Sequence, residues 1–131
     1  MGQSRLFFFY RLPCFIWLFC IFMFSSIPAS GLPEMPSDTW LFWSHRFAHL
    51  FEYSVLGVLA ARAGLVVREN KSLKTFFVFT GVILCAAVFD EWHQSFVSGR
   101  TAALIDVIFD ILSGAGGVMA YQLWIYRPKK K

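Results

Sequence analysis

The hydrophobic positions of this chain fall into long runs separated by short polar segments. Three of the runs carry no charged residue, namely Leu12 to Pro33, Thr75 to Phe89 and Ile111 to Tyr126. A fourth run, Phe47 to Val67, carries only His49, Glu52 and Arg62. A helix needs about 20 mostly apolar residues to cross a hydrocarbon core of roughly 30 Å. The pattern therefore predicts four transmembrane helices, at approximately 9–28, 46–66, 74–93 and 103–126.

The composition also favours a membrane protein, because 57% of the residues are hydrophobic and only 15% are charged. A soluble domain of 131 residues could not bury that much apolar surface. We find no internal repeat, low-complexity tract or second domain. We expect one domain over residues 1–131, an all-α integral membrane protein whose four helices form a compact bundle. The Pro28 to Asp38 stretch is expected to be an irregular loop.

The basic residues predict the orientation of the bundle in the cell membrane. All but Arg46 and Arg100 fall on one side of the four-helix arrangement, namely Arg5, Arg11, Arg62, Arg68, Lys71, Lys74, Arg127, Lys129, Lys130 and Lys131. By the positive-inside rule, both termini and the 67–74 loop face the cytoplasm. The three histidines and every acidic residue except Glu69 then lie toward the outer side. Topology accounts for the basic face, so we expect the lipid bilayer as a partner and no nucleic acid.

The first apolar run also has features of a signal peptide. Arg5 and Arg11 precede it, and Ser26-Ile27-Pro28-Ala29-Ser30 at its end resembles a cleavage site. We expect the first helix to be retained. Its removal would leave the topology of the other three helices unchanged.

Polar residues recur at helical spacing toward the outer end of the second predicted helix. His45, His49, Glu52 and Tyr53 are three or four residues apart and therefore share one face. The same stripe continues inward through Gly57 and Ala60, whose small side chains let a neighbouring helix approach closely.

Two further predicted helices have similar stripes. In the fourth helix, Asp106 and Asp110 lie one turn apart, and Ser113, Gly114 and Gly117 continue their stripe. The third helix adds Ala86, Asp90, His93 and Gln94, with Glu91 next to them. Three helix ends thus bring their polar groups to a similar depth on the same side of the membrane.

These stripes predict a polar network that contains several carboxylates. The carboxylates would repel one another, so Arg100, a shared proton or a cation must offset their charge. Arg100 is the natural partner, since a guanidinium can pair bidentately with a carboxylate or with a phosphate of a ligand. Ser98 and Gly99 predict a turn that folds Arg100 back over the bundle. We expect one coupled network that contains Glu91, Gln94, Arg100 and Asp106.

Several of these residues also stand in a recognisable order. The segments are His49-Leu50-Phe51-Glu52-Tyr53 with Leu56-Gly57, then Asp90-Glu91-Trp92-His93-Gln94-Ser95-Phe96-Val97-Ser98-Gly99-Arg100, then Asp106 and Gly114. Over roughly residues 25–120 the chain resembles the VanZ-like family of small membrane proteins. The family's usual Lys before the His is Arg46 here, which keeps the charge. Its frequent Asn after the last Asp is Asp110 here, which adds a negative charge.

The resemblance implies a fold and a site, but it implies no reaction. Together with the helical spacing it predicts ten binding residues, namely Arg46, His49, Glu52, Tyr53, Asp90, Glu91, Gln94, Arg100, Asp106 and Asp110. The family's namesake is associated with low-level resistance to the glycopeptide antibiotic teicoplanin. A lipid-linked cell-wall precursor or a glycopeptide antibiotic is therefore the expected partner.

Three classes of function stay open at this point. The protein could be a non-enzymatic envelope protein that changes how an amphipathic antibiotic or a lipid-linked wall precursor meets the membrane. It could be an enzyme acting on a lipid head group, with Glu91 or Asp90 as general base, His49 or His93 as proton shuttle and Arg100 on a phosphate. It could bind or move a proton, cation or small solute, for which four helices suffice only in an oligomer.

The sequence contains no recognisable metal or cofactor motif. No two histidines form a His-Glu-x-x-His arrangement on one helix. Cys14, Cys20 and Cys85 fall within predicted spans and lack paired spacing. We expect no metal, cofactor or disulfide, and we expect the cysteines to act as buried small hydrophobic residues.

Overall fold

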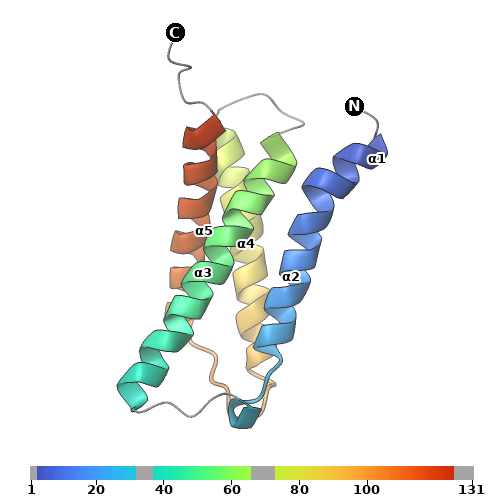
Figure 1. The fold of residues 1–131 in the computed structure, drawn as a ribbon. Helices are drawn as coiled ribbons and strands as arrows, with labels where there is room; N and C mark the ends of the chain where they lie inside the picture. Colours follow the sequence, from blue (N-terminus) through green and yellow to red (C-terminus); the bar gives the residue numbers. More distant parts are fainter. Residues whose placement is uncertain (1–2, 32–36, 66–72, 126–131) are drawn as a thin grey trace.

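The computed structural model describes residues 3–31, 37–65 and 73–125, and in this part of the chain four rods of helix pack side by side (Figure 1). The first rod consists of α1 (Gln3–Leu6), the π-helical turn η1 (Phe7–Arg11) and α2 (Leu12–Ser25). A short 3₁₀ turn follows, η2 (Ala29–Gly31). The other rods are α3 (Asp38–Leu65), α4 (Leu73–Gln94) and α5 (Leu104–Ile125). The described residues contain no strand, which confirms the prediction of an all-helical protein.

α4 and α5 begin and end within one residue of the predicted bounds, but α3 begins at Asp38 instead of residue 46. Ser37 explains the difference, because its side chain caps the helix. Its Oγ accepts a hydrogen bond from the backbone N–H of Trp40 at 3.4 Å, and its carbonyl accepts one from Leu41 at 3.0 Å. Such caps stabilise a helix start whatever the hydropathy of the first turns. The predicted start followed hydropathy alone and was therefore wrong.

The first rod also departs from its predicted bounds of 9–28. It begins at Gln3 and ends at Ser25, and its π-helical turn has a local cause. Pro13 has no backbone N–H, so the carbonyl four residues before it loses its usual helical donor. Directly before the proline, the Leu12 N–H bonds to the carbonyl of Phe7, five residues back, which is the wider spacing of a π-helix. The chain thus stays helical past the proline.

Large apolar side chains cover the outside of the bundle. Phe9, Phe19 and Leu112 are each more than 60% exposed, and such a surface suits contact with lipid chains. Within residues 3–31, 37–65 and 73–125, three helical segments are long and apolar enough to cross a membrane, namely Ser4–Ser25, Leu73–Gln94 and Leu104–Ile125. α3 is not among them, because it carries Arg46, His49, Glu52 and Arg62.

The interior is unusually polar for a small bundle. Among the described residues, the buried side chains include as many polar or charged ones as hydrophobic ones. All of the buried polar residues except Thr75 and Gln122 belong to one end of the bundle, among them His49, Asp90, Glu91, Asp106 and Asp110. We call this end, made of residues 24–31, 37–53 and 90–110, the polar end. The start of α1 and the end of α5 lie together at the opposite end (Figure 1).

α3 and α5 run parallel and pack with their backbones almost in contact (Figure 1). A Cβ atom on Gly57 would overlap the carbonyl oxygen of Gly114, and one on Gly117 would overlap the carbonyl oxygen of Ser54. Ala60, on the same stripe of α3, is buried. The predicted role of these small residues in close helix packing is thus confirmed.

Several sequence predictions fall outside the described residues. These concern most of the 67–74 loop and the charged residues Glu34, Arg68, Glu69, Lys71, Arg127, Lys129, Lys130 and Lys131. The cysteines are described, and all three are free. Cys14 and Cys20 are half-buried, whereas Cys85 is exposed. The prediction of a buried Cys85 was wrong, since this residue lies on the outward face of α4, where lipid replaces a protein core.

Replacing Gly117 by alanine should lower the stability of the protein in detergent, because the added methyl group meets the Ser54 backbone carbonyl. Overpacking of this kind costs about 1–3 kcal/mol. Gly116→Ala is the matched control, since nothing lies within 4 Å of a Cβ atom built there. It should leave stability unchanged or slightly raised, through helix propensity. Thermal unfolding followed by circular dichroism compares the two variants, and a loss of stability as large in Gly116→Ala would contradict the proposed contact.

Candidate functional site

The first polar contact at the polar end joins α3 to α5. His49 Nδ1 lies 3.0 Å from Asp110 Oδ1 and 3.3 Å from Asp110 Oδ2. Asp110 is completely buried, and His49 is 5% exposed. A carboxylate can only accept hydrogen bonds, so the proton sits on Nδ1 and the other ring nitrogen, Nε2, is left to face a ligand or a proton. Among the described residues, Nε2 has no hydrogen-bond partner.

A second pair lies one turn nearer the end of the bundle. Arg46 Nη2 and Asp106 Oδ1 are 3.3 Å apart, and the Arg46 guanidinium lies over the Phe109 ring at 5.8 Å. Asp106 stands in the first turn of α5, where the helix dipole favours a negative charge. Both aspartates of α5 therefore have a basic partner on α3.

Gln94 ties α4 to α2. Its amide nitrogen donates to Asp90 Oδ2 at 3.1 Å and to Ser25 Oγ at 3.3 Å. Asp90, Gln94 and Ser25 are all buried. Since both amide protons are used in these bonds, Gln94 can offer its remaining oxygen only as an acceptor.

The connection between α4 and α5 is fixed at both ends. The Ala103 backbone N–H donates to Glu91 Oε1, and the Ser98 carbonyl accepts from the Ala29 N–H at 3.1 Å. Gly99 between them has φ +75° and lies against Ala29. A side chain at Gly99 would be strained by this backbone conformation and would also meet the Ala29 methyl group. The predicted turn at Ser98 and Gly99 is thus confirmed.

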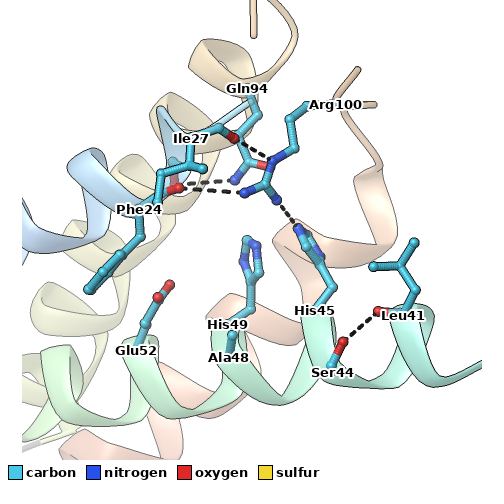
Figure 2. A pocket seen from close by; sticks show the side chains of 11 residues that line it. Phe24, Ile27, Leu41, Ser44, His45, Ala48, His49, Glu52, Gln94 and Arg100 are labelled. Atoms are coloured by element: carbon cyan, nitrogen blue, oxygen red, sulfur yellow. Dashed lines mark hydrogen bonds between the residues drawn. The ribbon is translucent and has the colours of Figure 1, made fainter. Parts of the chain in front are cut away.

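This turn delivers Arg100 to the end of α2, as Figure 2 shows. Arg100 Nε donates to the Ile27 carbonyl at 3.2 Å, Nη2 donates to the Phe24 carbonyl at 3.5 Å, and Nη1 bonds to His45 Nε2. A guanidinium only donates, so His45 accepts through an unprotonated nitrogen. Carbonyl groups at a helix C-terminus carry partial negative charge and attract a cation.

The expectation that Arg100 pairs with a carboxylate was therefore wrong. Among the described residues it makes no ion pair. Glu91, Gln94, Arg100 and Asp106 also form no single network, because each bonds to a different partner. The physical reason is that the exposed carbonyls of α2 compete for Arg100, while Arg46 reaches Asp106 from α3.

A cavity of about 250 Å³ opens beside Arg100, between the end of α2 and the first half of α3 (Figure 2). Its polar lining comes from Ser25, Ser44, His45, His49, Glu52, Gln94 and Arg100. Phe24, Ile27, Leu41 and Ala48 supply the apolar lining. Phe24 is 52% exposed and Leu41 is 44% exposed, so the apolar wall continues onto the outer surface of the bundle.

Glu52 is half-buried and points toward this cavity from α3 (Figure 2). Its carboxylate makes no hydrogen bond or ion pair with the residues that the structure describes. Its backbone carbonyl, by contrast, accepts a hydrogen bond from Trp17 Nε1 at 2.8 Å, which fastens α2 to α3 beneath the cavity.

Several predicted site residues do not line this cavity. Asp90 instead accepts a hydrogen bond from Gln94, and Glu91 accepts one from the Ala103 backbone N–H. The Tyr53 side chain is fully buried, and its hydroxyl has no hydrogen-bond partner among the described residues. His93 bonds through Nε2 to Ser26 Oγ at 3.0 Å and packs on the Phe22 ring. Of the predicted catalytic candidates, only His49 therefore faces the cavity.

The ten predicted binding residues leave out several residues that shape the site, among them Trp17, Ser25, Ser26 and His45. His45 could have been included, because it stands on the same stripe as His49. The other three lie on or just after α2, and nothing in their local sequence indicates which neighbours α2 meets. The described residues contain no group of three His, Cys, Asp or Glu side chains placed to hold a metal ion.

The chain was compared with models of known protein families. A family model described as VanZ/LLP1 matches residues 7–125, which is nearly the whole chain. The chain belongs to the VanZ/LLP1 family. The comparison with curated proteins found no match, and neither did the comparison with solved structures.

The VanZ/LLP1 match spans the first rod from Phe7 onward, the other three rods and every residue of the cavity. Membership confirms the resemblance seen in the His49 to Tyr53 and Asp90 to Arg100 segments. Together with the apolar helices, it identifies a membrane protein of the VanZ/LLP1 type.

The contacts predict which residue pairs are coupled energetically. Arg46→Ala and Asp106→Asn should be non-additive in the free energy of unfolding, with a coupling of about 0.5–3 kcal/mol. Arg100→Ala and Asp106→Asn serve as the comparison and should add to within about 0.5 kcal/mol, since they have different partners. Reversible unfolding in mixed micelles measures both cycles. A strong coupling between Arg100 and Asp106 would instead favour the single network.

Proposed function

We propose that the protein crosses the cytoplasmic membrane four times, with both termini in the cytoplasm and the polar end at the outer face. Three spans are supported by the apolar helices. α2 ends at the polar end and α4 begins at the opposite end, so the chain must cross between them, and α3 is the segment that does so (Figure 1). The basic residues Arg5, Arg11, Arg62 and Lys74 belong to the opposite end, which supports a cytoplasmic location for it.

We further propose that the protein is a binding protein of the cell envelope. The cavity beside Arg100 receives the polar head of an amphipathic molecule at the outer leaflet, a lipid-linked wall precursor or a glycopeptide antibiotic such as teicoplanin. By binding or shielding one of these molecules, the protein lowers the action of the antibiotic. The observation that carries this proposal is the mixed lining of one cavity, with a charged floor and an apolar wall.

The apolar wall of the cavity suits the chain of such a ligand, and the polar lining suits its head. Small-molecule sites are concave and largely apolar, with a few polar groups that fix orientation. Phe24 and Leu41 are open to the lipid side, so an acyl or prenyl chain can stay in the membrane while its head enters. Arg100 has N–H groups left over for an anionic group, because three of its five donors are used within the protein.

The ten predicted binding residues then divide into two groups. His49, Glu52, Gln94 and Arg100 line the cavity and contact the ligand, with His45 added to them. The remaining six are positioning residues. Asp110 holds His49, Asp90 holds Gln94, and Glu91 holds the connection between α4 and α5. Arg46 and Asp106 join α3 to α5, and the Tyr53 ring stacks on that of His49.

Expression of the protein in a teicoplanin-susceptible host should raise the inhibitory concentration of teicoplanin, and Arg100→Gln should abolish the increase. In nanodiscs, the same change should weaken binding of a fluorescent lipid-linked wall precursor about tenfold or more, since a hydrogen bond to a charged group contributes roughly 1.5–3 kcal/mol. His93→Gln is the matched control, because this polar residue lies outside the cavity. If all three proteins bind the precursor and protect the host equally, the proposed site is wrong.

A second candidate function is supported by the pairing of His49 with Asp110. An aspartate that fixes the tautomer and orientation of a histidine is the arrangement that prepares a general base. His49 Nε2 would take a proton from a water molecule that attacks a phosphate ester held by Arg100. The bond from phosphorus to the head-group or lipid oxygen would break, and that oxygen would leave with a proton.

Incubation of the purified protein with a lipid-linked wall precursor tests this candidate. Release of the free lipid or lipid phosphate, lost in His49→Gln and retained in Glu91→Gln, is the expected result for an enzyme, because His49 lines the cavity and Glu91 does not. Saturable binding without turnover would favour the binding protein. Mass spectrometry of the extracted lipids distinguishes the two.

A further inference from the structure

The cavity contains two opposite charges that are not paired with each other. Arg100 makes no ion pair among the described residues, and Glu52 makes neither an ion pair nor a side-chain hydrogen bond there. Both side chains line the same cavity of about 250 Å³, and Figure 2 shows them on opposite sides of it. Both side chains are half-buried, and a charge that is partly removed from water without an opposite charge beside it is costly, so a ligand that satisfies both would gain from each.

The neighbouring groups differ between the two sides. Beside Arg100, the Phe24 and Ile27 carbonyls and His45 use three of its N–H groups, which leaves two donors for an oxyanion. On the same cavity, Gln94 can present only its amide oxygen, because Asp90 and Ser25 take both of its amide protons. Figure 2 shows Gln94 on the side of Arg100, whereas Glu52 on the other side supplies carboxylate acceptors, which suit a group with several N–H donors.

We infer that the cavity binds a zwitterionic head group, with a phosphate on Arg100 and a primary ammonium on Glu52, as in an aminophospholipid of the ethanolamine type. This inference goes beyond the ligands proposed above and rests on the proposed function in one respect, because both require a cavity in which Arg100 binds the anionic group of an amphiphile. A phosphate pairs favourably with a guanidinium, and a primary ammonium has three donors for acceptor oxygens. A choline head group has no N–H donor, and a glycerol head group has no cation.

The membrane is the expected source of this ligand. Phe24 and Leu41 form an exposed apolar wall beside the charged lining. The acyl chains of a phospholipid can lie against such a wall, which free phosphoethanolamine cannot use. The lipid should therefore bind more tightly than its head group alone.

Binding of short-chain lipids to the full-length protein in detergent tests the inference. Dihexanoyl phosphatidylethanolamine should bind, and the phosphatidylcholine and phosphatidylglycerol of the same chain length should bind at least about tenfold more weakly, which corresponds to one lost charged hydrogen bond. Isothermal titration calorimetry compares all three lipids with free phosphoethanolamine. Equal affinity for the ethanolamine and choline lipids would overturn the ammonium site, and equal affinity for free phosphoethanolamine would overturn the lipid as its source.

Variants of Glu52 and Arg100 test which part of the head group each residue binds. Glu52→Gln should remove the preference for the ethanolamine lipid over the glycerol lipid, and Glu52→Asp, which keeps the charge, should retain part of it. Arg100→Gln should weaken both lipids, and His93→Gln should change neither. Equal thermal midpoints for the variants and the parent protein show that the effects are not due to unfolding. If Glu52→Gln leaves the lipid preference intact, the inference fails.

The outcomes also separate this inference from the proposed function. If the glycerol or choline lipid binds as well as the ethanolamine lipid, and Arg100→Gln abolishes that binding, the cavity is an amphiphile site and only the ammonium assignment fails. If none of the three lipids binds, and neither does the fluorescent wall precursor, then both fail together.

Discussion

The close backbone contact between α3 and α5 is the constraint on which the rest of the polar end depends. Gly57 and Gly117 permit this contact because a larger side chain at either position would meet a backbone carbonyl of the other helix. The short separation of the two helices is what allows His49 to reach Asp110 and Arg46 to reach Asp106. Without it, these charges would be buried without partners, at a cost of roughly 3–5 kcal/mol for each broken pair.

Lipid solvation explains why the polar residues gather inside and the apolar ones outside. In water, the hydrophobic effect would draw the phenylalanines inward, but lipid chains are as apolar as a protein core, so that driving force is absent within the membrane. What holds the bundle together is close packing and polar bonds between helices. Ser25, Trp17 and Arg100 supply such bonds to α2, which otherwise approaches its neighbours mainly through apolar side chains.

The sequence alone predicted the helical rods and part of the candidate site, because both follow from periodicity. His49, Glu52 and Tyr53 share a face by spacing, and Asp106 and Asp110 lie one turn apart, so their convergence could be expected. The partner of Arg100 could not, since it depends on carbonyl groups that are exposed only where α2 happens to end. The bonds from α2 to α3 and α4, through Trp17, Ser25 and Ser26, arise from tertiary packing and leave no periodic signal. The start of α3 at Asp38 could have been predicted from Ser37, a residue that favours helix N-caps, but the prediction used hydropathy alone.

The two charged pairs between α3 and α5 also settle how far one helix can slide along the other. Glycines have no side chains that could interlock with the neighbouring helix, so by themselves they would allow several axial positions of α3 against α5. A shift of one helical turn, about 5.4 Å, would bring Arg46 toward Asp110 and strand both His49 and Asp106 without a partner. The pairs thus permit a single register of α3 against α5, and they hold His49 and Glu52 at a fixed level along the axis of the bundle.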